Sequence, residues 1–450
     1  MNGASQEPSI IESVARRARV ASRAMLSVSS SEKDAALSAM REQLSKSKDR
    51  ILEANVADIS AAKARLAEGK ISASLVKRLE LGGAKFDGVL TGIASVRSLG
   101  DPVGECSLSR QIDDGLQLYR VACPIGVICV IFEARPEAAV QIASLAVKSA
   151  NAVILKGGKE AEKSNAALVE AIRAGLKSVN FPEDAVQLVA TREEVRELLD
   201  QSKCIDLIIP RGSNALVKYI TNNTRIPVMG HADGICSVYV DETASPSKAA
   251  NIVVDAKAQY PAVCNAAETM LVHRSALNTV LPVVGAALAE AGVELRADAA
   301  SKAVLDSVKG LKVVDVSAVD YDTEFLELIL AVKVVDSVDE AIAHINEHGS
   351  GHTDCIITED EGAARRFLGM VDSAGVYHNA STRFADGFRL GFGAEVGVST
   401  HRTHARGPVG LEGLMIYKYK LLGNGHTVKP YVDGDKVLKH KDTPDQLPPL

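Results

Sequence analysis

Short apolar runs alternate with amphipathic segments from about residue 116 onward. We predict that the apolar runs form strands at 126–132, 152–156, 186–189 and 205–209. Between them, apolar residues recur at helical spacing, which predicts helices at 136–148, 164–179 and 213–221, and one more between the last two strands. This order predicts an α/β fold with a doubly wound parallel sheet. Strands that are apolar throughout fit a sheet covered by helices on both faces.

The chain on either side of this region has a different pattern. The first hundred residues are rich in Ala, Ser, Leu, Lys and Glu, with a helix start at 29–32 and a second helix over about 50–67. A second β/α stretch runs from about Pro246 to Ser399. The tail from Thr427 is polar and contains prolines, so we expect it to be extended or partly disordered.

Composition narrows the class of protein. The 450 residues are 46% hydrophobic and 24% charged, as in ordinary globular proteins of two or three domains. A net charge of −6, no tryptophan and 4% aromatic residues argue against a nucleic-acid partner. No apolar run approaches the ~20 residues of a membrane span, and residues 1–8 lack the apolar core of a signal peptide. Seven cysteines without a CxxC pair indicate neither disulfides nor a zinc site, so we expect a cytoplasmic protein.

Cys264 is the residue best placed for chemistry. It follows a bend at Pro261 and precedes a strand-like run, Met270 to His273. A thiolate attacks carbonyl carbon and a thioester accepts hydride, so this cysteine points to chemistry on an acyl group or an aldehyde. The alternative is that Cys264 is a small buried apolar residue, as lone cysteines often are. That structural role is the one we assign to Cys106, Cys123, Cys129, Cys204, Cys236 and Cys355.

Two glycine turns follow predicted strands, at 155–159 and at 210–214. Glycine lets the backbone approach a phosphate, and a helix N-terminus favours negative charge. Lys156, Lys159 and Arg211 add positive charge that could accept a 2′-phosphate. The G-x-G-x-x-G fingerprint does not occur, and each turn alone could be an ordinary strand-to-helix turn with solvated lysines. The two turns together on one sheet favour nucleotide binding.

Several longer motifs occur in order along the chain. They are Cys123–Ile128, Ile131–Pro136, Asn151–Gly158, Ile209–Ser213, Cys264–Thr269, His344–His352, Asn379–Phe384, Gly391–Gly397 and His404–Pro408. Over about residues 10–425 the sequence resembles the gamma-glutamyl phosphate reductases, an outlying family of the aldehyde dehydrogenase superfamily. The resemblance implies NADPH-dependent reduction of L-glutamyl 5-phosphate to L-glutamate 5-semialdehyde, the second step of proline synthesis from glutamate.

In such an enzyme, the Cys264 thiolate would attack the acyl phosphate, and the Cys264 backbone N–H with a nearby donor would stabilise the oxyanion. Phosphate would leave, and hydride from the nicotinamide would reduce the remaining thioester to the aldehyde. The resemblance also implies a homodimer or homotetramer and allows functional coupling to glutamate 5-kinase.

The superfamily implies three parts for this chain. Residues 1–106 and 124–247 would form an NADPH-binding domain, and residues 248–405 a catalytic domain with Cys264. Residues 107–123 and 406–450 would form an oligomerisation flap and tail. The alternation of 117–121 is consistent with a hairpin in the flap.

The site residues follow from the matched motifs and the glycine turns. The residues expected at the cofactor are Lys156, Gly157, Gly158, Arg211, Gly212, Ser213 and Glu324. Those expected at the substrate are Arg135, His231, Asn265, Ser381 and Arg383. Some alternatives stay open: Arg135 as a structural loop arginine, Arg383 in a surface ion pair, and His231 with Asp233 in a capping role. His344, His348 and His352 recur every four residues, but the glycines after His348 break any helix, so we expect no metal there.

Two departures from the wider superfamily sharpen this interpretation. Oxidising aldehyde dehydrogenases carry a glutamate before the cysteine that activates the deacylating water, whereas residues 228–234 of this chain contain no glutamate. Water should therefore attack the thioester slowly, as an acyl-phosphate reductase requires. Where the oxidising enzymes have a Trp-Asn pair, this chain has Ala134 and Arg135.

Three rival functions remain at this stage. An oxidising aldehyde dehydrogenase is disfavoured by the missing glutamate, and a non-catalytic binding or structural module by the presence of Cys264. The reductase half of a kinase-reductase is disfavoured because no residues remain for a kinase domain.

Overall fold

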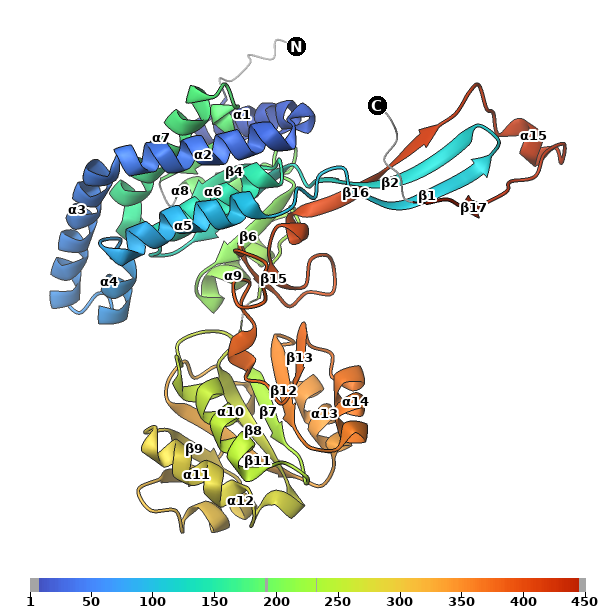
Figure 1. Cartoon of the computed structure of the whole chain (residues 1–450). Coiled ribbons are helices and arrows are strands. Elements are labelled where there is room, and N and C mark those ends of the chain that lie inside the picture. Colours follow the sequence, from blue (N-terminus) through green and yellow to red (C-terminus); the bar gives the residue numbers. More distant parts are fainter. Residues whose placement is uncertain (1–7, 191–192, 232, 445–450) are drawn as a thin grey trace, which may run out of the picture.

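The computed structural model describes residues 8–190, 193–231 and 233–444, which form two α/β lobes and a projecting β arm (Figure 1). The expectation about residues 1–8 therefore falls almost wholly outside the described residues. No helix in the described ranges is both long enough and apolar enough to cross a membrane.

The first lobe contains a parallel four-stranded sheet in the order β5-β4-β3-β6. Its strands are β3 (Val127–Phe132), β4 (Ala152–Lys156), β5 (Val186–Val189) and β6 (Leu207–Arg211). Its helices are α1 (Ile10–Ala24), α2 (Ser30–Lys46), α3 (Lys48–Ala67), α4 (Ala73–Leu79), α5 (Ala84–Ser98), α6 (Pro136–Lys148), α7 (Glu162–Ser178), α8 (Glu193–Leu199) and α9 (Asn214–Asn222). The predicted helix start is confirmed, because Ser29 and Glu32 form a capping box at the beginning of α2.

The order of these strands creates a switch point beside β3. The chain passes from β3 outward to β4 and β5, then crosses back so that β6 pairs with the other edge of β3. In open α/β sheets, ligands bind at the carboxyl ends of the strands where the order reverses. In this lobe those ends carry Glu133, Ala134 and Arg135 after β3, and Arg211 at the end of β6.

The second lobe is built on a parallel seven-stranded sheet in the order β10-β9-β11-β8-β7-β12-β13. Its strands are β7 (Cys236–Val240), β8 (Ala267–His273), β9 (Glu294–Ala297), β10 (Lys312–Asp315), β11 (Ile329–Val335), β12 (Thr353–Ile357) and β13 (Gly375–His378). Its helices are α10 (Pro246–Ala258), α11 (Leu281–Glu290), α12 (Ala299–Leu305), α13 (Val338–His348) and α14 (Glu361–Met370).

Alternate residues of the central strands face two separate cores. Met270 and Val272 of β8 pack with residues of α10, α11 and α12, whereas Leu271 packs with residues of α13 and α14. Helices therefore cover both faces, which agrees with the α/β fold predicted from the sequence. The chain passes from the sheet of the first lobe to the sheet of the second before Cys236, because β7 already pairs with β8 and β12 of the second sheet. The domain boundary predicted at 247–248 lies after that strand and stays a prediction.

The arm is an antiparallel four-stranded sheet in the order β16-β2-β1-β17, extending away from the first lobe (Figure 1). Its strands are β1 (Cys106–Asp113), β2 (Leu116–Pro124), β16 (Met415–Leu422) and β17 (Lys441–Asp442). The predicted hairpin is present as β1 and β2, and the C-terminal segment joins it through β16 and β17.

The tail after Thr427 has more structure than we expected. It contains α15 (Lys429–Val432) and the short strand β17, which adds to β1 because the backbone of Arg110 and Gln111 pairs with it. The last six residues lie outside the described part. A further pair of strands, β14 (Gly397–Ser399) and β15 (Gly407–Val409), lies in the segment that leads back to the arm.

Candidate active site

Cys264 lies in the loop between α10 and β8, in a half-buried position. The loop is held on both sides of the thiol. The Ala266 N–H donates to the carbonyl of Val263 at 3.0 Å. The Asn265 amide donates to the carbonyl of Ala385 at 2.9 Å, and the Thr382 hydroxyl donates to the carbonyl of Asn265 at 2.7 Å. A thiol that is accessible and fixed in this way suits a nucleophile better than a core residue.

Gly234 lets the chain before β7 lie directly against this loop. A Cβ at Gly234 would be 2.3 Å from the Cys264 carbonyl oxygen and 2.4 Å from its Cα. Real Cβ atoms do not approach other atoms so closely. A residue without a side chain is therefore needed for the two segments to pack as they do.

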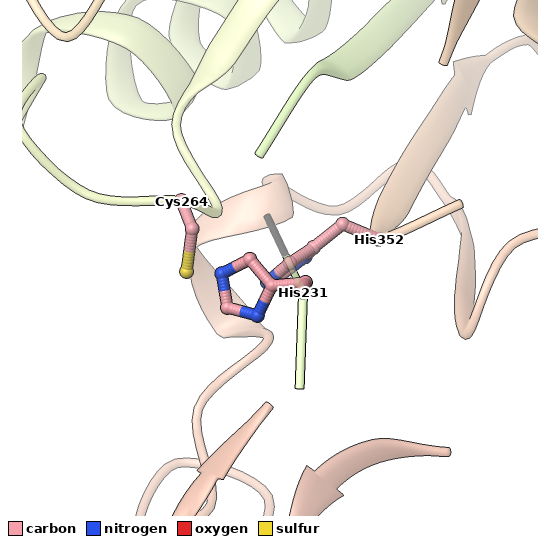
Figure 2. Close-up of side chains that lie close together, drawn as sticks. All are labelled: His231, Cys264 and His352. Carbon is pink, nitrogen blue, oxygen red and sulfur yellow. The ribbon is translucent and has the colours of Figure 1, made fainter. Parts of the chain in front are cut away.

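Two histidines approach the thiol from other parts of the chain (Figure 2). His231 precedes β7, and His352 follows α13. One ligand atom from each histidine and the sulfur of Cys264 all lie within 4.8 Å of one another. The two rings form an edge-to-face pair with centroids 5.1 Å apart. His231 Nδ1 lies 2.9 Å from the Val398 carbonyl, so this residue bonds to β14 rather than capping a helix.

Arg383 is buried beside the cysteine loop. It lies in the 3₁₀ turn η6 (Thr382–Phe384), where it donates to the side-chain oxygen of Gln259 at 3.0 Å and to that of Asn265. Burial lowers the pKa of Arg383, Arg389 lowers it further, and Asp255, Cys264 and Asp386 act in the opposite direction. In the described chain Arg383 forms no ion pair, so the alternative of a surface ion pair is wrong. Ser381 caps η6, because its hydroxyl accepts the Arg383 N–H.

Arg211 lies closer to the thiol than its place in a glycine turn suggested. Burial lowers the pKa of Arg211, and this effect is opposed by Glu395 and by Cys264, while Arg135 adds to it. The carboxyl of Glu395 accepts the Gly387 N–H at 2.9 Å, and burial raises its pKa against the effect of Arg211. The switch point of the first lobe therefore brings Arg211 within electrostatic reach of the cysteine of the second lobe, with Arg135 close to Arg211.

Glu324 is also brought to this region. Burial raises the pKa of Glu324, and the N–H of Gly234 and the imidazole of His231 counteract that effect. Glu324, which sequence similarity assigned to the cofactor, therefore lies next to the cysteine loop. Its proposed contact with a nicotinamide ribose stays a prediction.

The glycine turns are packed against the protein itself. A Cβ at Gly157 would overlap the Asn165 side chain, one at Gly158 would be 3.0 Å from the Ala134 nitrogen, and one at Gly212 would be 2.9 Å from the Glu133 carboxyl. That carboxyl accepts the Ser213 N–H at 3.1 Å, so this amide at the start of α9 already has an acceptor.

Of the lysines in the first turn, Lys156 is buried, and its ammonium donates to the Gly157 carbonyl at 2.6 Å. Lys159 is exposed, which agrees with the alternative interpretation that it is a solvated lysine of an ordinary turn.

Sequence reasoning missed two groups at this site, His352 and Glu395. Spacing grouped His352 with His344 and His348, but α13 ends at His348. The rings of His344 and His348 are tilted against each other, with centroids 4.4 Å apart beside Tyr321, whereas His352 lies near the thiol. In the described residues, the group able to hold a metal ion is instead His231, Cys264 and His352.

Comparisons with known proteins identify the family. The model of the aldehyde dehydrogenase family matches residues 3–304. A gamma-glutamyl phosphate reductase from Nostoc punctiforme is 54% identical over 373 residues, which are 83% of this chain and 85% of the relative. The chain belongs to the gamma-glutamyl phosphate reductases of the aldehyde dehydrogenase family. The resemblance, the fold class and the prediction of an enzyme of this kind are therefore confirmed.

Two further relatives extend the match over nearly the whole chain. A probable gamma-glutamyl phosphate reductase from Schizosaccharomyces pombe is 49% identical over 437 residues, 96% of this chain and 97% of the relative. The crystal structure of a gamma-glutamyl phosphate reductase from Thermotoga maritima has 40% identity and a TM-score of 0.89, and the match covers 93% of this chain and 100% of that one. The fold built from the first lobe, the second lobe and the arm is thus one that this chain shares with that enzyme.

Proposed function

We propose that this chain reduces L-glutamyl 5-phosphate to L-glutamate 5-semialdehyde and phosphate with NADPH, the second step of proline synthesis from glutamate. The observation that carries the proposal is the thiol of Cys264, half-buried, beside two imidazoles and electrostatically coupled to Arg211 and Arg383. The names of the relatives support this reaction, and the arrangement of the site suits an anionic acyl compound.

The first chemical step belongs to Cys264. Its proton passes to His231, whose Nδ1 donates to the Val398 carbonyl and whose Nε2 therefore holds the free lone pair. The thiolate attacks the carbonyl carbon, a C–S bond forms, and the C–O bond to phosphate breaks with its electron pair leaving on phosphate. The Cys264 N–H stabilises the oxyanion. Positive charge from Arg211 and Arg383 favours both the bound substrate and the departing phosphate.

Slow hydrolysis of the thioester is part of the proposal. The carboxyls of Glu324 and Glu395, both coupled to His231, are engaged by the backbone amides of Gly234 and Gly387. Residues 228–234 supply no glutamate. A water molecule near the thioester thus lacks a dedicated carboxylate base, and the acyl group survives until it is reduced.

The switch point of the first lobe fits a dinucleotide. The carboxyl ends of β3, β4 and β6 carry Arg135, Lys156 and Arg211, and this concentration of positive charge suits an anionic cofactor. We propose that Lys156, Gly157, Gly158, Arg211, Gly212 and Ser213 hold NADPH, with Glu324 at its nicotinamide end. When bound, NADPH supplies the hydride that converts the thioester to the aldehyde.

We propose that Arg383, Ser381, Asn265, His231 and Arg135 bind the substrate. Arg383 is the strongest member, because a buried guanidinium bonded to two neutral amides leaves its charge available for an incoming carboxylate or phosphate. Ser381 and Asn265 act mainly by holding Arg383 and the cysteine loop in place.

We further propose that the arm joins subunits into a homodimer or homotetramer. Its edge strand β16 carries apolar side chains that are 38–59% exposed, namely Ile416, Tyr417, Tyr419, Leu421 and Leu422. An exposed apolar edge strand is a site for pairing with another chain. A cytoplasmic location and functional coupling to glutamate 5-kinase, whose product would be this substrate, complete the proposal.

The reverse reaction tests the function. NADP reduction by the purified protein with glutamate 5-semialdehyde should depend strictly on inorganic phosphate, because phosphate must release the acyl group from Cys264. Cys264→Ser should abolish this activity, while Cys106→Ser, a control on the arm, should retain it. Phosphate-independent oxidation would instead favour an oxidising aldehyde dehydrogenase and overturn the proposal.

A further inference from the structure

We propose that Cys264, His231 and His352 form a Zn²⁺ site, and that its occupation reversibly inhibits the enzyme. One thiolate and two imidazoles are a common ligand set for zinc, and three protein ligands leave a fourth position for water. The three ligand atoms lie within 4.8 Å of one another and come from three separate segments of the chain. The proposal concerns metal binding and does not depend on the identity of the substrate.

The hydrogen bonds of His231 prepare it as a ligand. A backbone carbonyl only accepts, so the contact at 2.9 Å to Val398 requires the proton on Nδ1. The lone pair is then on Nε2, the nitrogen left to face the thiol. An outer hydrogen bond of this kind fixes the tautomer and the ring orientation in most zinc-bound histidines.

His352 provides the independent observation. It is 1% exposed, its Nδ1 lies 3.0 Å from the Thr353 hydroxyl, and its Nε2 is buried. Within the described residues, this Nε2 has no hydrogen-bond partner. Leaving a buried polar atom without a partner is unfavourable, so a ligand that engages it is favoured. A metal ion at Nε2, with the Nδ1 proton directed to Thr353, would satisfy both nitrogens.

The distances require only a small adjustment. Zinc bonds of about 2.3 Å to sulfur and about 2.0–2.1 Å to nitrogen put tetrahedral ligand atoms roughly 3.3–3.6 Å apart. The separations of up to 4.8 Å must therefore shorten by about 1.2–1.5 Å at most, which rotations of the Cys264 and His231 side chains can provide. Arg211 and Arg383 oppose a cation here, whereas the carboxyls of Glu324 and Glu395 offset them.

Zinc binding and catalysis then exclude each other, because both need the sulfur of Cys264. Zn²⁺ replaces the thiol proton, so the Cys264 S–H bond breaks, an S–Zn bond forms and one proton is released to solvent. The sulfur lone pair needed for attack on the acyl carbon is then engaged by the metal. No oxidation occurs, so a chelator should restore the free thiol and the activity.

Cobalt provides a direct readout of the site. Co²⁺ added to the metal-free, full-length protein in a non-thiol reductant should produce a thiolate-to-cobalt absorption band and visible bands of a tetrahedral ion. Cys264→Ser should remove the thiolate band. His352→Asn should weaken Zn²⁺ binding, measured by isothermal titration, by at least about tenfold. Cys106→Ser and His348→Asn serve as matched controls and should bind like the wild type.

The outcomes separate the proposals. If the wild type gives no thiolate band, or if His352→Asn and His348→Asn bind Zn²⁺ equally, the site is wrong. Should His352→Asn fail to fold by circular dichroism, His231→Asn provides the same test. Zinc should inhibit the reverse reaction at concentrations that match its dissociation constant, and EDTA should reverse the inhibition. Binding without inhibition would overturn the regulatory consequence, and binding in a protein without reductase activity would leave the metal site intact.

Discussion

Gly234→Ala should damage catalysis while leaving the fold intact. The added Cβ would be 2.4 Å from the Cys264 Cα and 2.6 Å from its Cβ, whereas ordinary contact begins at 3.4 Å. The cysteine loop must therefore move by about 1 Å, and a displacement of that size near reacting atoms can cost about 10²-fold in rate. We expect kcat/KM of the phosphate-dependent reverse reaction to fall about 100-fold, or about 2.7 kcal/mol of transition-state stabilisation.

Gly230→Ala is the matched control in the same segment. Its Cβ would meet nothing closer than the Pro210 ring at 3.4 Å, so its activity should stay near that of the wild type. Thermal unfolding and the rate of Cys264 alkylation should be recorded for both variants, to separate a displaced thiol from an unfolded protein. Wild-type kcat/KM in folded Gly234→Ala would refute the argument that this glycine positions the nucleophile.

Four more predictions concern stability, substrate binding and assembly. Lys257 and Glu268 form a wholly buried ion pair at 2.5 Å, so Lys257→Met should lower the free energy of urea unfolding by about 3–5 kcal/mol, and adding Glu268→Leu should recover most of that loss. A loss below about 1 kcal/mol in Lys257→Met would contradict the argument. Burial raises the pKa of Asp354 from 3.8 to about 7, so the folded state binds its proton more tightly. The wild type should lose stability relative to Asp354→Asn, by about 4 kcal/mol at most, as pH rises from about 4 to about 7; parallel pH profiles in urea unfolding would exclude this. Arg383→Lys should raise KM for phosphate in the reverse reaction about tenfold or more with a smaller change in kcat, and an unchanged KM would remove Arg383 from the substrate site. Leu421→Asp should reduce oligomer size in analytical ultracentrifugation while Lys418→Ser should not, and equal sedimentation of the two variants would argue against the arm as the interface.

The elements of the first lobe were predictable where the pattern was continuous. The run Ala152–Lys156 is apolar up to its lysine and forms β4 over the predicted residues. The last strand was predicted two residues too early, because Ile205 is apolar and buried but lies before β6. Asp206 explains the shift, because its carboxyl accepts the Val127 N–H and pairs with Arg19. Asp206 is therefore the last residue of a loop, and the strand pairing begins at Leu207.

The site could be predicted only where local sequence carries the chemistry. Cys264 stands in a distinctive motif, and Arg383 in another, so the sequence alone made both of them candidates. His352 was not, because its approach to Cys264 depends on how β12 and the cysteine loop are placed in the second lobe, and spacing along the chain grouped it with two histidines of α13. The buried pair Lys257 and Glu268 was missed for the same reason: each residue looks solvated in the sequence, and only packing of α10 against β8 buries both.

The connection between the lobes explains how groups so distant in sequence come together at the proposed active site. The segment from Ser381 to Ser399 contacts both lobes. Near its start, the Ala385 carbonyl and the Thr382 hydroxyl hold Asn265 beside the thiol. Near its end, Val396 packs in the core of the first lobe, and a Cβ added at Gly397 would be 3.7 Å from the Arg211 side chain. Since one segment is anchored both at the nucleophile and at the switch point, the thiol and the proposed dinucleotide site are held in fixed relation without direct pairing of the two sheets. A substitution that loosens either anchor should therefore raise the activation free energy of the proposed hydride transfer by more than it lowers the free energy of unfolding of either lobe.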